Sequence, residues 1–379
     1  MAAAQKKTPV RGLEGVVAGD TEISYVDGDN GELYYRGYHL DELAGKVSYE
    51  ELVYLLWYGK LPNRKELEAF GSMLMNNMKL PVEIVEIIRL APPRYNPMVL
   101  LRTCQSALGL FDPDGGKISD DANMRKSVRI LAQMAAIVAA MHRIENDEKV
   151  ISPSAKMGFA ENFLYMFTGK RPNKLDIQVF DCLLVLHADH GLAASSFAAR
   201  VTVSTLAGMH SAITTALATL KGALHGGANT RVMKMLEEID SPSSVKKYIS
   251  SMLSDGRKVM GFGHRMYKVE DPRSRHLRKY SQKLASRPGV ANLFEISKHI
   301  EKQVLEEKGI YPNIDFYSAT VQHALGIPKE YFTCIFAVAR TAGWIAHVLE
   351  QFADNRLIRP TSRYIGGYGH KFVPIENRK

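Results

Sequence analysis

Residues 201–220 (VTVSTLAGMHSAITTALATL) contain no Asp, Glu, Lys or Arg. A charge-free segment of this length must either cross a membrane or be covered by protein on all sides. Its Ser, Thr and His side chains make it too polar for lipid, whereas its small residues suit a tightly packed helix. The segment therefore predicts a helix buried inside a large helical protein or in a contact between subunits.

Hydrophobic periodicity extends the helical prediction to most of the chain. A helical pattern covers Tyr49 to Tyr58, and another leads into residues 128–142. In the second half the predicted helices cover 157–170, 175–189, 192–220, 229–238, 243–254, 273–286, 290–308, 315–325 and 329–353. Only residues 21–37 show strand alternation, around an Asp-Gly-Asp-Asn-Gly turn. We therefore expect an all-α fold with a short N-terminal β-hairpin.

The length of 379 residues favours two domains. Glycine-rich breaks at 222–227 and 326–328 are candidate hinges. They predict a small inserted domain, residues 227–328, within a large domain made of residues 1–226 and 329–379. If both breaks act as hinges, the two points at which the chain passes from one domain to the other must lie side by side. The tail from residue 364, rich in glycine and aromatic residues, is expected to be an arm that lies on another surface.

Composition narrows the class of partner. The net charge of +9 suits nucleic acid, a membrane surface or a small anion. The Lys and Arg residues are spread along the chain, so we expect neither a nucleic-acid nor a membrane partner. Three widely spaced cysteines in apolar contexts indicate reduced core residues. The start MAAAQKKTPVRG has no apolar core of signal-peptide length, so a cytoplasmic protein is expected.

Two histidines stand in glycine-bearing turns. His225 lies in GALHGGAN, and the turn is either a solvated loop or a place where a small ligand meets the backbone. His264 follows Gly261-Phe262-Gly263, which lacks the third glycine and the preceding strand of a dinucleotide fingerprint. Its backbone N–H groups, with Lys258, Arg265 and Lys268 nearby, predict an anion or phosphate site, and a solvated basic loop is the alternative.

Three charges occupy unusual places. Asp315 is the only Asp, Glu, Lys or Arg between Lys308 and Lys329. It is either a helix N-cap or a desolvated carboxylate of raised pKa that serves as a base. Arg340 is the only formal charge in 331–349, and it needs either an internal carboxylate partner or a bound carboxylate. Arg273 would lie in the first turn of a helix capped by Asp271, where a cation is unfavourable without an anion.

A pair of histidines, His187 and His190, has the i, i+3 spacing that places both on one helical face. No further ligand with metal-site spacing lies nearby, so we expect no metal. A metal hydrolase built on this pair is kept as an alternative.

Several segments, taken in order, resemble citrate synthase in its compact archaeal and bacterial form. They are LHADHG (186–191), GALHGGAN (222–229), GFGHRMYKVEDPR (261–273), NIDFYSA (313–319), ARTAGW (339–344) and IRPTS (358–362). The resemblance implies a two-domain, all-α dimer. It also implies an acyltransferase of citrate (Si)-synthase type that condenses acetyl-CoA with oxaloacetate, hydrolyses citryl-CoA and feeds the tricarboxylic acid cycle. Coenzyme A would enter as a co-substrate, with no tightly bound cofactor.

The resemblance also implies a role for each unusual residue. His225 would hydrogen-bond the thioester carbonyl, Asp315 would remove a methyl proton, and His264 would polarise the ketone of oxaloacetate. The oxaloacetate-binding residues implied are His190, Arg273, Arg340 and, from across the dimer interface, Arg359. The coenzyme A region implied comprises Lys258, Gly261, Phe262, Gly263 and Lys268.

Two departures leave the acyl group open. His190 is followed by Gly-Leu-Ala and His264 by Arg-Met-Tyr, unlike the longer forms of the family. The alternative of 2-methylcitrate synthase, acting on propionyl-CoA, therefore stays open, because one methylene changes selectivity by only about 10–200-fold. A silent binding regulator is a further alternative, and the presence of both His225 and Asp315 argues against it.

Overall fold

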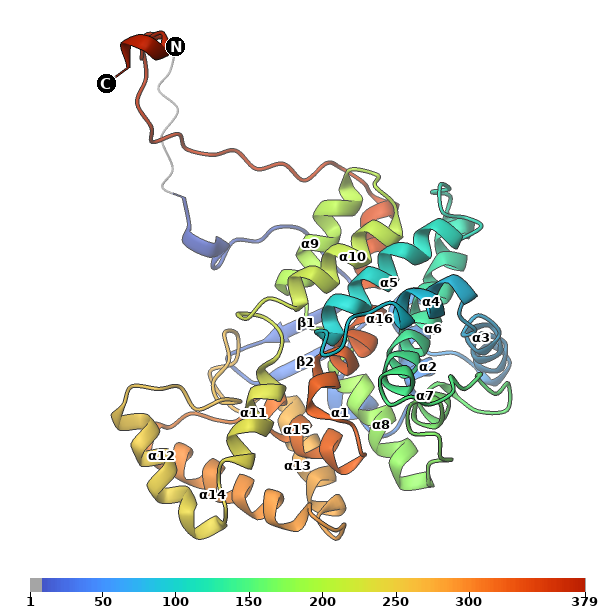
Figure 1. Cartoon of the computed structure of the whole chain (residues 1–379), viewed down its shortest axis with the longest axis vertical. Coiled ribbons are helices and arrows are strands. Elements are labelled where there is room, and N and C mark those ends of the chain that lie inside the picture. The colour runs from blue at the N-terminus through green and yellow to red at the C-terminus, as the bar shows by residue number, and fades with distance from the viewer. Residues whose placement is uncertain (1–8, 379) are drawn as a thin grey trace.

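The computed structural model describes residues 9–378, and the part described is mainly helical (Figure 1). The first half of the chain forms α1 (Leu40–Leu43), α2 (Tyr49–Tyr58), α3 (Arg64–Asn76), α4 (Val82–Arg89), α5 (Pro97–Phe111), α6 (Asp120–Glu145), α7 (Phe159–Thr168) and α8 (Lys174–His187). The second half forms α9 (Ala194–Ser204), α10 (Met209–Leu220), α11 (Ala228–Glu237), α12 (Val245–Ser254), α13 (Pro272–Leu284), α14 (Ala291–Lys308), α15 (Ile314–Ala324) and α16 (Phe332–Ala353). The all-α prediction is confirmed. Residues 1–8, on which much of the signal-peptide argument rests, lie outside the described part.

The predicted N-terminal hairpin is present. β1 (Ser24–Asp27) pairs antiparallel with β2 (Glu32–Tyr35), and Asp27 opposite Glu32 closes the turn. A third strand, β3 (Tyr38–His39), pairs with β2 and gives the sheet order β1-β2-β3. The sequence did not predict β3, because two residues are too few to show strand alternation.

The core is built around α16, which packs against α2, α6, α8, α9 and α10. Trp344, in the middle of α16, is fully buried. By length and composition alone, two helical stretches could cross a membrane, Asp120–Glu145 and Lys329–Ala353, and most of each lies inside the protein. Burial of this extent is what core helices of a folded domain show.

Two parts of the helical prediction need correction. The expected helix 192–220 is two helices, α9 and α10, because the backbone leaves the helical region at Leu206 (φ 63°) and Gly208 (φ 87°). The two halves pack on each other and on α16, but Leu206 between them is 51% exposed, so the charge-free segment is only partly covered. Helices α3, α4 and α5 were not predicted. In α3 only Phe70, Leu74 and Met75 are buried, so its apolar stripe is narrow.

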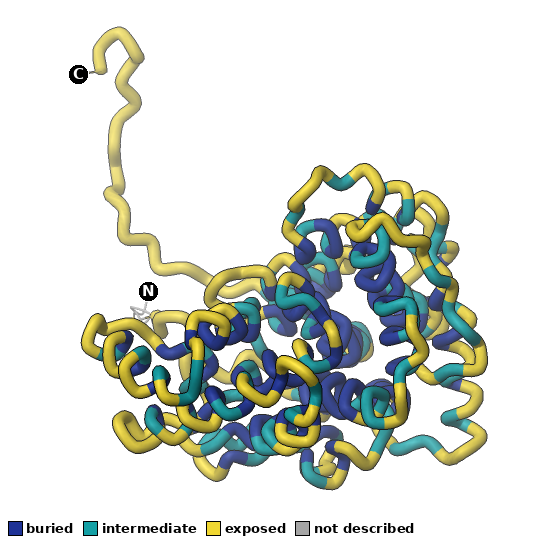
Figure 2. The backbone as a smooth tube through the Cα atoms, turned by 60° about the horizontal axis from the view of Figure 1, so that its bottom comes forward, coloured by how far each residue is buried: buried dark blue, intermediate teal, exposed yellow. Residues whose placement is uncertain are grey.

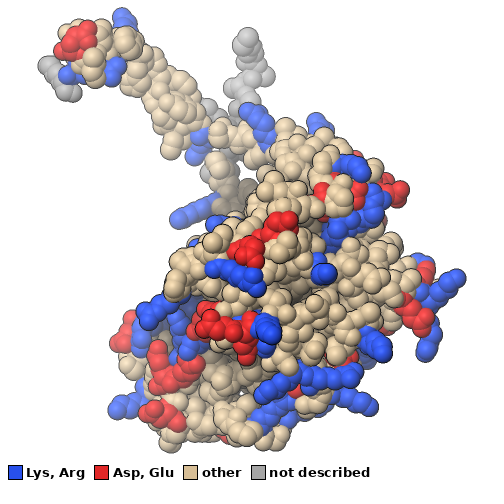
Figure 3. Space-filling model, turned by 45° about the vertical axis from the view of Figure 1, so that its right-hand side comes forward, with Lys and Arg blue, Asp and Glu red and all other residues tan. Residues whose placement is uncertain are grey.

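The helices α11 to α15 lie together, in yellow and orange at the lower left of Figure 1, before the chain returns through α16. Beyond α16 the chain leaves the body as an extended arm that is exposed along its length (Figure 2). Its apolar side chains Ile365, Tyr368 and Phe372 are each more than 80% exposed. On the face of Figure 3 basic and acidic side chains are interspersed.

Candidate active site

His225 lies on the turn between α10 and α11. Gly226 allows this turn to fold against the end of α10, because a Cβ there would overlap the carbonyl oxygen of Leu220. The backbone N–H of Ser195 donates to His225 Nε2 (3.3 Å), and Ser195 Oγ lies 2.8 Å from the same nitrogen. Trp344 Nε1 donates in turn to Ser195 Oγ (3.0 Å).

These contacts assign the His225 ring proton. A backbone N–H can only donate, so Nε2 accepts and the proton of the neutral ring lies on Nδ1. Burial, with a smaller contribution from the Arg340 charge, lowers the pKa of His225 to about 4. At neutral pH His225 is therefore an uncharged hydrogen-bond donor through Nδ1.

His264 is oriented by its own turn. Its Nδ1 accepts hydrogen bonds from the backbone N–H groups of Met266 (3.0 Å) and Tyr267 (3.2 Å), so the ring proton lies on Nε2. Burial lowers the pKa of His264 to about 4, and the Arg273 charge adds to the effect. Nε2 lies 3.4 Å from Arg273 Nη2, and because both nitrogens then carry protons this contact is not a hydrogen bond.

The turn before His264 lies beside the start of α15. Gly263 N donates to Tyr311 O (3.0 Å), and Asn313 N donates to Gly261 O (2.8 Å). Phe262 forms an isolated bridge with Pro312. This pairing places the turn before His264 beside the residues that precede Asp315, and it also occupies the N–H of Gly263. The anion site expected at this turn therefore loses one of its predicted donors.

Asp315 is not the cap of its helix. Asn313 is the N-cap residue of α15, and its Oδ1 accepts a hydrogen bond from Asp315 N (3.0 Å). The capping interpretation of Asp315 is therefore wrong, because the cap lies two residues earlier. Burial raises the pKa of Asp315 to about 6. A carboxylate of this pKa is still ionised at neutral pH and is a better base than an exposed one.

Asp271 caps α13 as predicted, and it also holds Arg273. Its Oδ1 accepts from Arg273 N (3.0 Å) and Nε (2.9 Å), and its Oδ2 accepts from Arg273 Nη2 (2.8 Å). Oδ2 also accepts from Ile314 N (3.1 Å), which ties α13 to the residue before Asp315. The unfavourable first-turn cation is thus offset by a buried carboxylate within the same turn.

Arg340 is buried without such a partner. Its Nε donates to His187 O (2.6 Å), and its guanidinium lies 4.6 Å from the centre of the Phe336 ring. Within residues 9–378 no carboxylate lies within 4.0 Å of the guanidinium, so the internal ion pair kept as an alternative is absent there. Burial lowers the pKa of Arg340 to about 10. An incoming carboxylate fits this site, because guanidinium forks bind carboxylates in bidentate geometry.

His187 and His190 do not share a helical face. Helix α8 ends at His187, whose ring packs on Phe336, whereas His190 lies beyond the helix end. His190 Nε2 is 3.1 Å from Tyr267 OH, and its ring packs against His264. In the described part of the chain no group of three His, Cys, Asp or Glu residues is placed to hold a metal ion.

Tyr267 is a site residue that the sequence did not reveal. It is 5% exposed and lies against His190, His264 and Arg273. Its only sequence signal was an aromatic residue between Arg265 and Lys268.

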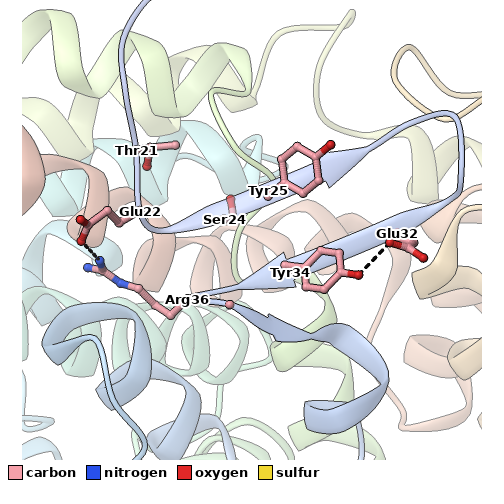
Figure 4. A pocket seen from close by; sticks show the side chains of 8 residues that line it. Thr21, Glu22, Ser24, Tyr25, Glu32, Tyr34 and Arg36 are labelled. Carbon is pink, nitrogen blue, oxygen red and sulfur yellow. Dashed lines mark hydrogen bonds and ion pairs between the residues drawn. The ribbon is translucent and has the colours of Figure 1, made fainter.

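Three further predicted residues are exposed, unlike the buried site residues described above. Lys258 is exposed, and Arg359 is exposed in the segment that follows α16. Lys268 is also exposed and pairs with Asp29 at the tip of the hairpin (2.8 Å). A pocket of about 360 Å³ on the hairpin, lined by Tyr25, Glu32 and Tyr34 among others, includes none of the predicted site residues (Figure 4).

Similarity to known proteins identifies the family of this chain. A family model described as "Citrate synthase, C-terminal domain" matches residues 12–361. The chain belongs to the citrate synthase family.

The citrate synthase 2 of Bacillus subtilis is 46% identical over 372 residues, which is 98% of this chain and 100% of that protein. The solved citrate synthase of Pyrobaculum aerophilum has a TM-score of 0.91 at 38% identity and covers 98% of this chain and 95% of that one. The solved ternary complex of carboxymethyl coenzyme A and oxaloacetate with the Thermoplasma acidophilum citrate synthase has a TM-score of 0.91 at 34% identity. It covers 97% of this chain and 99% of that one.

Membership in the citrate synthase family confirms the predicted activity at the level of the reaction. The chain is a transferase that condenses acetyl-CoA with oxaloacetate to make citrate, the entry step of the tricarboxylic acid cycle. Coenzyme A is a co-substrate of the family. The propionyl-CoA alternative is not favoured by these relatives.

Proposed function

We propose that His225, His264 and Asp315 carry the condensation. Asp315 removes a proton from the methyl group of acetyl-CoA, and the Nδ1–H of His225 donates to the thioester oxygen. A thioester methyl is a very weak acid, so this hydrogen bond must stabilise the developing enolate. Two observations carry the proposal: His225 is neutral and is held as an Nδ1–H donor by Ser195, and Asp315 is buried with a pKa of about 6. The charge of the buried Arg340 acts on both residues.

The enolate carbon then attacks the ketone carbon of oxaloacetate and forms the new carbon–carbon bond. His264 donates its Nε2–H to the ketone oxygen as negative charge develops there. Water hydrolyses the resulting citryl thioester to citrate and coenzyme A. Both histidines act as uncharged donors, which matches the pKa of about 4 for each.

Arg273, Arg340 and His190 are proposed to bind oxaloacetate. The substrate is a dianion at neutral pH, and Arg340 has no carboxylate within ion-pair distance among the described residues. The Thermoplasma acidophilum complex holds oxaloacetate and a coenzyme A analogue on a closely similar fold. We propose that coenzyme A binds at Lys258, Gly261, Phe262, Gly263 and Lys268, as the resemblance of this segment to the family implies.

Closure of a small domain, residues 227–328, over a large domain, residues 1–226 and 329–379, is a further part of the proposal. It is supported by the hydrogen bond from Thr230 Oγ1 to Lys329 O (3.0 Å), which joins the two chain crossings. Closure would exclude water during condensation. Small-angle scattering with and without oxaloacetate tests it, and an unchanged radius of gyration would contradict closure.

A homodimer is proposed from the exposed apolar arm beyond α16, which needs a second surface to cover it. Arg359, on this arm, would reach the oxaloacetate site of the partner subunit. Sedimentation tests the dimer, and a species at the 42.3 kDa chain mass at micromolar concentration would contradict it.

We also propose a cytoplasmic enzyme with no tightly bound cofactor, and attack on the si face of oxaloacetate. Product analysis with isotopically labelled acetyl-CoA tests the face.

The decisive experiment is a thiol-release assay with acetyl-CoA and propionyl-CoA, each with and without oxaloacetate. We expect oxaloacetate-dependent release that is faster with acetyl-CoA. Asp315→Asn should lower kcat by about 10²–10⁴-fold, the range for loss of a general base. Asp255→Asn, an exposed substitution after α12, is the matched control and should leave kcat unchanged. Unchanged thiol release by Asp315→Asn would refute the assigned base.

A further inference from the structure

Asp189 is a buried carboxylate that the proposed mechanism does not use. It lies between His187 and His190 and has no exposed surface. Its Oδ2 accepts hydrogen bonds from Ser24 Oγ (2.5 Å) and Gly191 N (3.0 Å). Its Oδ1 lies 3.2 Å from Nε2 of His347, a residue of α16 that is also fully buried. A buried charge is costly unless it is well paired, so these contacts need an explanation.

The same contacts hold the backbone on both sides of His190. Ser24 Oγ accepts from Gly191 N (3.0 Å), and Tyr35 OH donates to Asp189 O (2.9 Å). Ser24 belongs to β1, where Figure 4 shows it beside Tyr25, and Tyr35 belongs to β2. The N-terminal hairpin therefore forms hydrogen bonds with the residues on both sides of His190, Asp189 and Gly191.

Helix α16 approaches this segment closely enough to bring Asp189 near Arg340. Gly343 N donates to Ala188 O (3.1 Å), and a Cβ at position 343 would overlap both Ala188 O and Asp189 Oδ1. Only glycine permits this approach. The charge of Asp189 raises the pKa of Arg340 and so opposes the effect of burial. Asp189 thus acts on a guanidinium that has no carboxylate within ion-pair distance among the described residues.

We propose that Asp189, held by Ser24, is a positioning residue for oxaloacetate binding. Through its contacts with Ser24 and Gly191 it fixes the backbone on both sides of His190. The N-terminal hairpin then belongs to the oxaloacetate subsite, although none of its residues needs to touch substrate. The inference rests on the proposed function, because it takes His190 and Arg340 as oxaloacetate ligands.

Ser24→Ala tests the proposal with little change of shape. It removes the hydroxyl that donates to Asp189 and accepts from Gly191. We expect the KM for oxaloacetate to rise about tenfold, as for loss of a hydrogen bond to a charged group. The kcat and the KM for acetyl-CoA should change less than about threefold, because the reacting groups stay in place. Calorimetric titration of oxaloacetate should show the same rise in Kd.

Four further variants separate a positioning role from a purely stabilising one. Ser24→Thr keeps the hydroxyl on a strand and should restore the wild-type KM. Ser297→Ala removes a buried hydroxyl that donates only within α14, and it is the matched control for lost burial. Asp189→Asn should weaken oxaloacetate binding more than Ser24→Ala does, and Asp20→Asn, exposed just before β1, is its control.

Wild-type activity distinguishes failure of the positioning role from failure of the proposed function. If the wild-type chain releases no thiol from acetyl-CoA with oxaloacetate, the proposed function falls, and this inference falls with it. If the wild type is active but Ser24→Ala keeps its KM and Kd for oxaloacetate, the positioning role alone is refuted. A lower melting temperature of Ser24→Ala with unchanged oxaloacetate affinity also refutes it, since that result describes a purely structural contact.

Discussion

The turns that carry His225 and His264 differ in how they hold their histidines. Each histidine has a pKa of about 4, so each is neutral at physiological pH. His264 is oriented by backbone N–H groups two and three residues further along its own turn. His225 is oriented by Ser195, thirty residues away, which is held in turn by Trp344 of α16. One histidine is set locally and the other by tertiary packing.

The two arrangements place the ring proton on opposite nitrogens, Nδ1 in His225 and Nε2 in His264. A side-chain substitution can therefore remove one part of the support of His225, the Ser195 hydroxyl, whereas both donors to His264 are backbone N–H groups that survive most substitutions. Substitutions around the two histidines, and the pH dependence of the rate, test this contrast.

Removing either imidazole should have the largest effect. His225→Ala and His264→Ala should each lower kcat by about 10²–10³-fold, the cost of losing one donor to a developing oxyanion. His299→Ala, on the exposed surface of α14, is the control. A loss below about threefold in either variant, measured by thiol release, would remove that histidine from the mechanism.

The pH dependence of kcat/KM should reveal the titration of Asp315 and of neither histidine. A carboxyl of raised pKa loses its base form as the pH falls through about 6, so kcat/KM for acetyl-CoA should fall about tenfold per pH unit below 6. The histidines stay neutral until about pH 4 and should add no step above it. A rate profile from pH 4.5 to 8 measures this, and activity that rises on acidification would contradict the assignment.

Ser195→Ala should affect His225 alone. It removes the hydroxyl between Trp344 and His225 but leaves the backbone N–H of residue 195 in place. We expect kcat to fall about tenfold, the order expected for one lost hydrogen bond in a buried network. Ser196→Ala is the matched control, because the buried Ser196 hydroxyl has no hydrogen-bond partner among the described residues. Equal activities of the two variants would show that the hydrogen bonds from Trp344 through the Ser195 hydroxyl do not orient His225.

Met266→Ala should have the smallest effect. Met266 orients His264 through its backbone N–H, and its side chain is 49% exposed. We expect kcat to change less than about twofold, as for most surface substitutions. A larger drop, with an unchanged melting temperature, would mean that the side chain and not the backbone supports His264.

Local patterns were enough to predict much of the fold. The capped helix α2, the hairpin turn at Asp27 and the Asp271-Pro272 start of α13 depend on residues within a few positions of one another. Helix α3 and the break between α9 and α10 were missed. The first has a narrow apolar stripe, and the second depends on backbone angles at Leu206 and Gly208 that periodicity does not encode.

For the site, the sequence by itself determined which residues are unusual: a histidine in each of two glycine-bearing turns, a lone acid and a lone arginine. Only the tertiary structure decided what surrounds them. It placed Ser195 and Trp344 behind His225, gave the cap of α15 to Asn313 and left Arg340 without a carboxylate partner among the described residues. Capping and turn preferences act over about four residues, whereas burial and charge depend on which distant segments pack together.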